Sequence, residues 1–195
     1  MSVLARGLLS VLGIAALALA SPSSARAEPS SVVHRLELGT TARSSLPNAE
    51  TLCLGAVLGY AVVRGGFGAR ARVGLCGSQF DQGQVRANIR AQDLDVRLYH
   101  GWTLGIVTLE VGLGGGAVWF NQEFTGAFSA PSRNTLAPFT ALGTRVVLAM
   151  MRGFYAGADL AGETHFIRMQ KDAASPMEQT ASFALRASLA LGKQF

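Results

Sequence analysis

Residues 51–77 read TLCLGAVLGYAVVRGGFGARARVGLCG and contain two apolar stretches joined by a short turn at residues 64–65. In the first stretch the even positions from Leu52 to Val62 carry apolar or aromatic side chains, whereas the odd positions include Cys53 and two glycines. The second stretch alternates in the same way and places both of its arginines on one face. A period of two residues is typical of β-strands, so this segment predicts an antiparallel hairpin.

The same alternation recurs along the chain and predicts eight strands. Each has about 11–16 residues, more than the ~5–6 of globular sheets and enough for a tilted strand to cross a bilayer. The connections after the second, fourth and sixth strands (64–65, 101–104 and 151–153) are short, and the others (43–50, 77–84, 121–135 and 169–180) are longer and polar. This asymmetry is typical of outer-membrane barrels, whose long loops lie outside the cell. The predicted strands are 32–42, 51–63, 66–77, 86–100, 105–120, 136–150, 154–168 and 181–195.

Charged residues of the predicted strands fall mainly on the face opposite the leucines and valines. A charge facing hydrocarbon at mid-depth costs ~2–4 kcal/mol for Arg or Lys, so we expect the apolar face to contact lipid. A soluble barrel with an apolar interior is the alternative, but its outer face would be rich in Lys and Glu, whereas this polar face is largely Gly, Ala, Ser and paired charge. The predicted interior charges, six cations and six anions, are Arg35, Glu37, Arg70, Arg72, Asp93, Asp95, Arg97, Glu110, Arg145, Asp159, Glu163 and Arg186.

The fifteen aromatic residues gather near the two ends of the predicted strands and leave the middles aliphatic. Membrane–water interfaces select such aromatic girdles. The predicted girdle at the short turns contains Tyr60, Phe67, Tyr99, Trp102, Phe154, Tyr155 and Phe195. The predicted girdle at the long loops contains Phe80, Trp119, Phe120, Phe124, Phe128, Phe139, Phe166 and Phe183. One member of each girdle, Tyr99 at the short turns and Phe139 at the long loops, falls on the inward face of its predicted strand.

Residues 1–27 have the features of a cleaved signal peptide. A basic residue, Arg6, precedes an apolar segment at 8–20, and a small-residue cleavage site follows at 25–27. A membrane-anchor helix is the alternative, but the apolar segment is shorter than the ~18 residues of a spanning helix. We therefore expect a mature chain of residues 28–195 that forms one domain.

The last predicted strand, FALRASLALGKQF at 183–195, alternates and ends in an aromatic residue. It resembles the assembly signal of outer-membrane barrels, and the whole chain resembles the small OmpA- or OmpX-type barrels of Gram-negative bacteria. The resemblance implies an all-β, eight-stranded antiparallel up-and-down transmembrane β-barrel, located in the outer membrane among its lipids, recognised by the barrel-assembly machinery and monomeric. The residues that match the assembly signal are Phe183, Leu185, Leu189, Leu191 and Phe195.

Cys53 and Cys76 are the two cysteines of the chain. A turn at residues 64–65 would pair residue 63 with 66 and place the two cysteines directly opposite on the inward face. Export through the oxidising periplasm favours a disulfide between them. Two buried thiols are the alternative, and a metal site is disfavoured because the pattern places no histidine near them.

A catalytic site must also be considered. His165, Glu163 and Asp159 share the inward face, which could form a general-base constellation, but no serine stands out as a nucleophile. We therefore expect a structural network, no enzyme activity, no metal and no cofactor. Removal of Arg6 and Arg26 lowers the net charge from +5 to +3, and the scattered arginines do not indicate a nucleic-acid partner.

These features predict a structural or interaction scaffold with long extracellular loops and a charge-paired, closed lumen. The interior of an eight-stranded barrel is just wide enough for side chains to fill. Inward glycines leave some space, so a narrow channel or a small-ligand transporter is the first alternative, and a lipid-modifying enzyme is the second. The sequence does not identify an extracellular partner.

Overall fold

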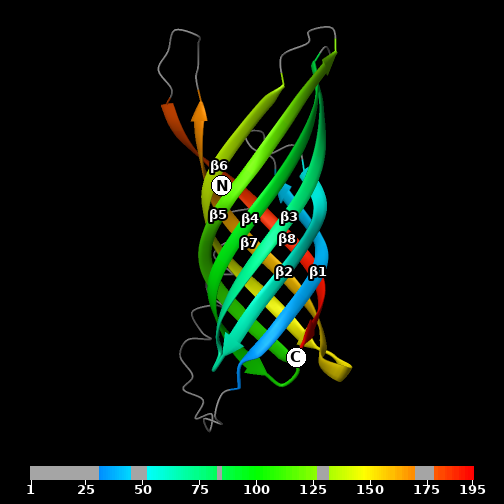
Figure 1. Ribbon diagram of the computed structural model, residues 1–195, viewed down its shortest axis with the longest axis vertical. Coiled ribbons are helices and arrows are strands. Elements are labelled where there is room, and N and C mark those ends of the chain that lie inside the picture. Colours follow the sequence, from blue (N-terminus) through cyan, green and yellow to red (C-terminus); the bar gives the residue numbers. More distant parts are fainter. Residues whose placement is uncertain (1–30, 45–51, 83–84, 127–131, 170–177) are drawn as a thin grey trace, which may run out of the picture. The chain divides into compact units, whose positions relative to one another are not determined.

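The computed structural model describes residues 31–44, 52–82, 85–126, 132–169 and 178–195. The expected signal peptide, residues 1–27, lies outside the described residues. Eight strands form a closed barrel in chain order (Figure 1). The strands are β1 (Val33–Ser44), β2 (Leu52–Arg64), β3 (Phe67–Gln82), β4 (Val85–Leu104), β5 (Val107–Gly126), β6 (Arg133–Ala149), β7 (Phe154–Met169) and β8 (Glu178–Gln194).

The barrel closes where β8 pairs with β1, so that each strand is hydrogen-bonded to two antiparallel neighbours (Figure 1). The closing register places Arg35 opposite Gln194, and the backbone groups of His34 and Phe195 form two hydrogen bonds of 3.0 Å. Full closure leaves no open sheet edge, which is the condition for a sheet in lipid. The predicted all-β, up-and-down eight-stranded barrel is therefore confirmed. In the part of the chain that the structure describes, no helix is long and apolar enough to span a membrane.

The turn between β2 and β3 lies one residue later than predicted. Arg64 pairs with Phe67, and the turn consists of Gly65 and Gly66, whose φ angles are 58° and 84°. Two consecutive positive φ angles match a type I′ hairpin turn, which glycine adopts without steric cost. The predicted pairing of residue 63 with 66 is therefore wrong by two residues. A shift of two keeps every side chain on its predicted face.

Several strands are longer than predicted. The predicted connection at 77–84 is mostly strand, because β3 continues to Gln82 and β4 begins at Val85. The predicted connection at 101–104 belongs to β4, and the turn to β5 lies at residues 105–106. Polar outward side chains such as Gln79 and Asp81 gave the first of these segments the composition of a loop, although its backbone still pairs with β4.

The two faces of the wall differ as the alternation predicts. Leucines such as Leu38, Leu189 and Leu191 point outward, with about two-thirds of their surface exposed, whereas the alternate charged residues are buried inside. The aromatic girdles are incomplete, because four of the predicted members point into the lumen. Exposed rings at the short turns are Tyr60, Phe67, Phe154 and Phe195, those at the long loops include Trp119 and Phe183, and the four lumen rings are Tyr99, Phe120, Phe139 and Tyr155.

Candidate functional site

Charged side chains fill the middle of the barrel lumen. The twelve interior charges predicted from the sequence all face the lumen, and eleven of them are buried. The twelfth, Arg35, is half-buried beside Glu110. The structure adds Arg43, which was missed because the first strand was predicted to end at residue 42. A period of two from Arg35 onward would have included it.

Three sets of ion pairs cross the whole width of the lumen. Arg35 of β1 donates to Glu110 of β5 at 2.6 Å. Arg72 of β3 donates to Asp159 of β7 at 3.2 Å, and Arg186 of β8 pairs with Asp95 of β4. The two strands of each pair lie four positions apart in the ring of eight, which is the greatest separation possible. These side chains therefore bridge opposite walls.

Asp95 and Glu163 are the centres of the network. Asp95 contacts the guanidinium groups of Arg72 at 2.9 Å and Arg97 at 3.0 Å, in addition to that of Arg186. Glu163 contacts Arg43 at 3.0 Å and Arg186 at 2.9 Å. Each buried carboxylate is attracted by several guanidinium groups, and this attraction offsets the free-energy cost of removing the charges from water.

Tyrosine residues lie at the short-turn end of the network. Glu37 pairs with Arg145 and accepts a hydrogen bond of 3.2 Å from the Tyr155 hydroxyl. The Arg70 guanidinium lies 5.5 Å from the ring centroid of Tyr99, and that of Arg145 lies 5.7 Å from the ring centroid of Tyr155. Such cation–π contacts extend the polar network to the rings near the lumen end.

Inward glycines provide the space in which the large lumen side chains lie. A Cβ atom at Gly68 would come within 2.3 Å of the Tyr99 ring, and one at Gly192 would approach the Tyr155 ring equally closely. Charged side chains cover further glycines in the same way: Glu37 covers Gly59, Asp93 covers Gly74 and Arg145 covers Gly157. At these positions the space that the sequence left for a channel or ligand is occupied by side chains of the adjacent strand.

An apolar layer lies on the long-loop side of the charges. Phe139 and the Cys53–Cys76 disulfide belong to it, together with Val118 and Phe120. The Arg43 and Arg186 guanidinium carbons lie 6.0 Å from the Phe139 ring centroid, so this ring joins the two layers. The remaining members are Ala91, Ala137, Ala141 and Ala184, with Ile89 and Ile167 packed against them.

The disulfide has a different register from the predicted one. Cys76 lies opposite Gly55, not Cys53, because the turn is shifted by one residue. The bond is therefore diagonal, with 5.4 Å between the two Cα atoms, which is within the range for disulfides. A Cβ at Gly55 would lie 2.7 Å from that of Cys76, so glycine leaves room for the bridge.

His165 is fully buried in the lumen and bonds Glu163 through Nε2 at 3.0 Å. Its ring lies 5.0 Å from that of Phe139. Ser182 of β8 is its register partner, a relation that the sequence analysis missed. Among the described residues, no hydrogen bond joins Ser182 to His165. Within the described ranges, no group of three His, Cys, Asp or Glu side chains is arranged to hold a metal ion.

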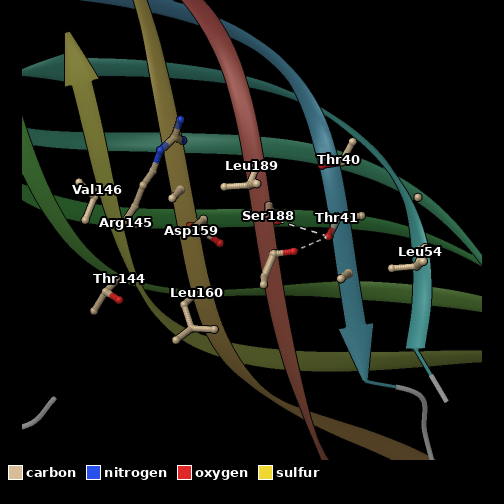
Figure 2. A pocket seen from close by; sticks show the side chains of 14 residues that line it. Thr40, Thr41, Leu54, Thr144, Arg145, Val146, Asp159, Leu160, Ser188 and Leu189 are labelled. Atoms are coloured by element: carbon tan, nitrogen blue, oxygen red, sulfur yellow. Dashed lines mark hydrogen bonds between the residues drawn. The ribbon is translucent and has the colours of Figure 1, made fainter. Parts of the chain in front are cut away.

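The outer face has a groove of about 720 Å³ that crosses β6, β7, β8, β1 and β2 (Figure 2). Small side chains such as Ala158 and Ala187 form its floor, and Leu54, Leu160 and Leu189 rise around it. Thr41, Arg145, Asp159 and Ser188, which also line the groove, have buried side chains that belong to the lumen face.

Four of the five residues of the predicted assembly signal lie on the outer face of β8, and the fifth, Phe195, directly follows this strand. Their side chains are exposed, and Leu185, Leu189 and Leu191 form the apolar row between the rings of Phe183 and Phe195. The Phe195 ring stacks on His34 of β1, with 5.9 Å between the ring centroids. Two strand cations outside the lumen network, Arg90 and Lys193, are exposed on the outer face.

Comparison with solved structures identifies the architecture. A major outer-membrane protein of Thermus thermophilus aligns with a TM-score of 0.60 and 13% identity, over 85% of this chain and all of that one. The chain has the fold of the small outer-membrane β-barrels. The attachment invasion locus protein Ail of Yersinia pestis aligns with a TM-score of 0.56 and 13% identity, over 84% and 99% of the two chains. Neisserial surface protein A aligns with a TM-score of 0.54 and 9% identity, over 86% and 98%.

Comparisons with protein-family models and with curated proteins found no match. The apolar outer wall fits a lipid environment, and the three structural neighbours are all bacterial surface or outer-membrane proteins. Both observations are consistent with a location in the outer membrane.

Proposed function

We propose that this chain is a monomeric outer-membrane scaffold whose lumen is closed and whose long loops face the cell exterior. The barrel-assembly machinery would insert it after export and removal of residues 1–27.

The ion pairs that cross the lumen carry this proposal. They join β1 to β5, β3 to β7 and β4 to β8, so a solute moving along the axis would have to separate buried opposite charges. Breaking a buried pair costs several kcal/mol, because it leaves an uncompensated charge. The apolar layer around Phe139 and the disulfide adds a second barrier on the long-loop side.

A narrow channel or small-ligand transporter is the competing function. It would need a continuous path through the lumen, and the inward glycines were its strongest support. Side chains of neighbouring strands cover several of these glycines, which favours the closed scaffold. Conductance of the protein in a planar bilayer separates the two functions, because a channel gives discrete current steps.

We also propose that the chain has no enzyme activity. His165 and Glu163 are buried, and Ser182 makes no hydrogen bond to the imidazole among the described residues. A serine-directed fluorophosphonate probe tests this proposal for serine-dependent catalysis. The folded protein should remain unlabelled, whereas labelling that disappears in Ser182→Ala would establish a reactive serine.

The membrane location has its own test. The protein should fractionate with outer membranes and migrate differently in detergent gels before and after boiling, because a closed barrel resists unfolding by detergent. Recovery in the soluble periplasmic fraction would contradict the proposal.

A further inference from the structure

We propose that the outer face of β6, β7, β8 and β1 binds one anionic phospholipid, with its phosphate at Lys193 and Arg152 and an acyl chain in the groove. This inference rests on the proposed membrane location. The groove and the two cations are separate features of the fold, and both cations lie at the short-turn end of the barrel, near the residues that end the groove.

The groove extends over two adjoining hollows of the outer face. The 720 Å³ hollow continues into a second one of about 430 Å³, and the two share Thr40, Val146, Ala158 and Leu189. The second hollow is lined by apolar residues and one threonine, Thr40, without a charged side chain. An apolar groove within the lipid-facing band fits a hydrocarbon chain.

The second hollow ends one outward position away from Lys193 on β8. Its lining includes Ala156 on β7 and Leu191 on β8. The next outward positions on these strands are Phe154 and Lys193, which lie opposite each other in the β7–β8 register. The Lys193 ammonium lies 5.6 Å from the centroid of the Phe154 ring, which keeps the charge beside the end of the groove.

Arg152 lies in the turn that precedes Phe154. Its φ angle is 60°, and it is the one non-glycine residue with a positive φ in the described part of the chain. Arg152 and Gly153 both have positive φ angles, the pattern of a tight hairpin turn, and this turn leaves the Arg152 side chain exposed. A Cβ at the adjacent Gly153 would lie 2.9 Å from the Gln194 carbonyl oxygen, so the turn packs against the end of β8 that carries Lys193.

Charge complementarity favours an anionic headgroup. Arg152 and Lys193 are exposed, and the described acidic side chains outside the lumen, Asp81 and Glu123, lie at the opposite end of the barrel. Basic residues near a membrane surface contribute about 1 kcal/mol each to the binding of anionic lipid. Short turns face the periplasm in this class of barrel, so the site would take a phospholipid of the periplasmic leaflet.

Native mass spectrometry tests this site. Protein extracted from membranes is exchanged into micelles that contain equal amounts of phosphatidylglycerol and phosphatidylcholine with identical acyl chains. The wild type should retain phosphatidylglycerol preferentially, and Arg152→Gln combined with Lys193→Gln should reduce this preference by about ten-fold or more. The matched control combines Arg64→Gln with Arg90→Gln, which removes two exposed cations elsewhere and should retain the preference.

A second variant tests the groove. Ala158→Phe fills the floor and should reduce retention of both lipids, whereas Ala71→Phe on the outer face of β3 should not. Heat-modifiable migration of each variant shows that the barrel is folded, so loss of the membrane barrel and loss of the lipid site give different results. If Arg152→Gln with Lys193→Gln does not fold, Lys193→Gln alone is measured, and its preference should fall by about five-fold.

The proposal is overturned if the wild type retains both lipids equally, or if the cation variant keeps the wild-type preference. It is also overturned if the groove binds a second copy of the chain, seen as a dimer mass that Ala158→Phe abolishes.

Discussion

Arg35 on β1 and Glu110 on β5 form an ion pair of 2.6 Å between strands on opposite sides of the barrel. Glu110 also lies 3.7 Å from Arg70 of β3, and Arg70 contacts Asp159 of β7 at 3.1 Å. These ion pairs thus form one connected network that joins β1, β3, β5 and β7. The lumen is therefore internally cross-linked by side chains, and removal of one central charge should affect the whole barrel.

Replacement of Asp95 by alanine should strongly destabilise the barrel. Three guanidinium groups would lose their shared carboxylate in a buried setting, which predicts a loss of about 3–5 kcal/mol in the free energy of unfolding. Urea unfolding in lipid vesicles, followed by tryptophan fluorescence, measures the change. Glu123→Ala removes an exposed carboxylate and is the control. Equal stability of the two variants would show that the network does not support the fold.

Gly192→Ala should also destabilise the protein. The added methyl group would displace the Tyr155 ring, whose hydroxyl donates to Glu37. Overpacking of this kind costs about 1–3 kcal/mol in the free energy of unfolding. In the control, Gly77→Ala, the nearest atom to the new Cβ is 3.9 Å away, so the same unfolding assay should show little change. A Gly192→Ala protein as stable as Gly77→Ala would refute the tight packing of Tyr155 on glycine.

The Cys53–Cys76 bond should be present in protein recovered from membranes. The bond encloses residues 53–76, for which chain entropy alone suggests about 3 kcal/mol, but neighbouring strands already restrain this hairpin. We therefore expect the double variant Cys53→Ser with Cys76→Ser to lose less than this value. Mass spectrometry after alkylation without reduction should find the linked peptides. Two alkylated thiols would contradict the bond.

Phe195→Ser should impair assembly more than stability. The ring is exposed, so burial contributes little, but the residue closes the β1–β8 seam and matches the assembly signal. Phe67→Ser is a matched control, because Phe67 is about equally exposed at the same end of the barrel. Quantification of folded protein in the outer membrane should show a large decrease for Phe195→Ser alone. Similar amounts of both variants would argue against an assembly role.

The sequence predicted the fold because alternation determines which side chains face lipid and which face the lumen. Arg72 and Asp95 have inward parity in the sequence, so both were expected in the interior. Their 2.9 Å contact depends on the β3–β4 register, whereas the Arg72–Asp159 contact depends on how the sheet closes. Closure brings together strands that are far apart in the chain. Local periodicity shows which face a side chain lies on, but not which distant side chain it meets across the lumen.

The errors in register and strand ends also have local causes. The sequence is compatible with a turn at residues 64–65 or at residues 65–66. The structure has the turn at 65–66, where both residues are glycines with positive φ angles. The polar composition of the segment around Gln79 is typical of a loop, although β3 continues through it beyond the apolar band. The outer groove was not predicted, because its small side chains come from several strands.

Single-channel recording tests the closed lumen most directly. Purified folded protein is added to a planar bilayer under an applied voltage, with a known porin measured in the same buffer as a positive control. The charge network and apolar layer predict a silent bilayer for the wild-type barrel. Reproducible discrete current steps, carried by protein whose folding is verified by heat-modifiable migration, would contradict the closed lumen and favour a channel.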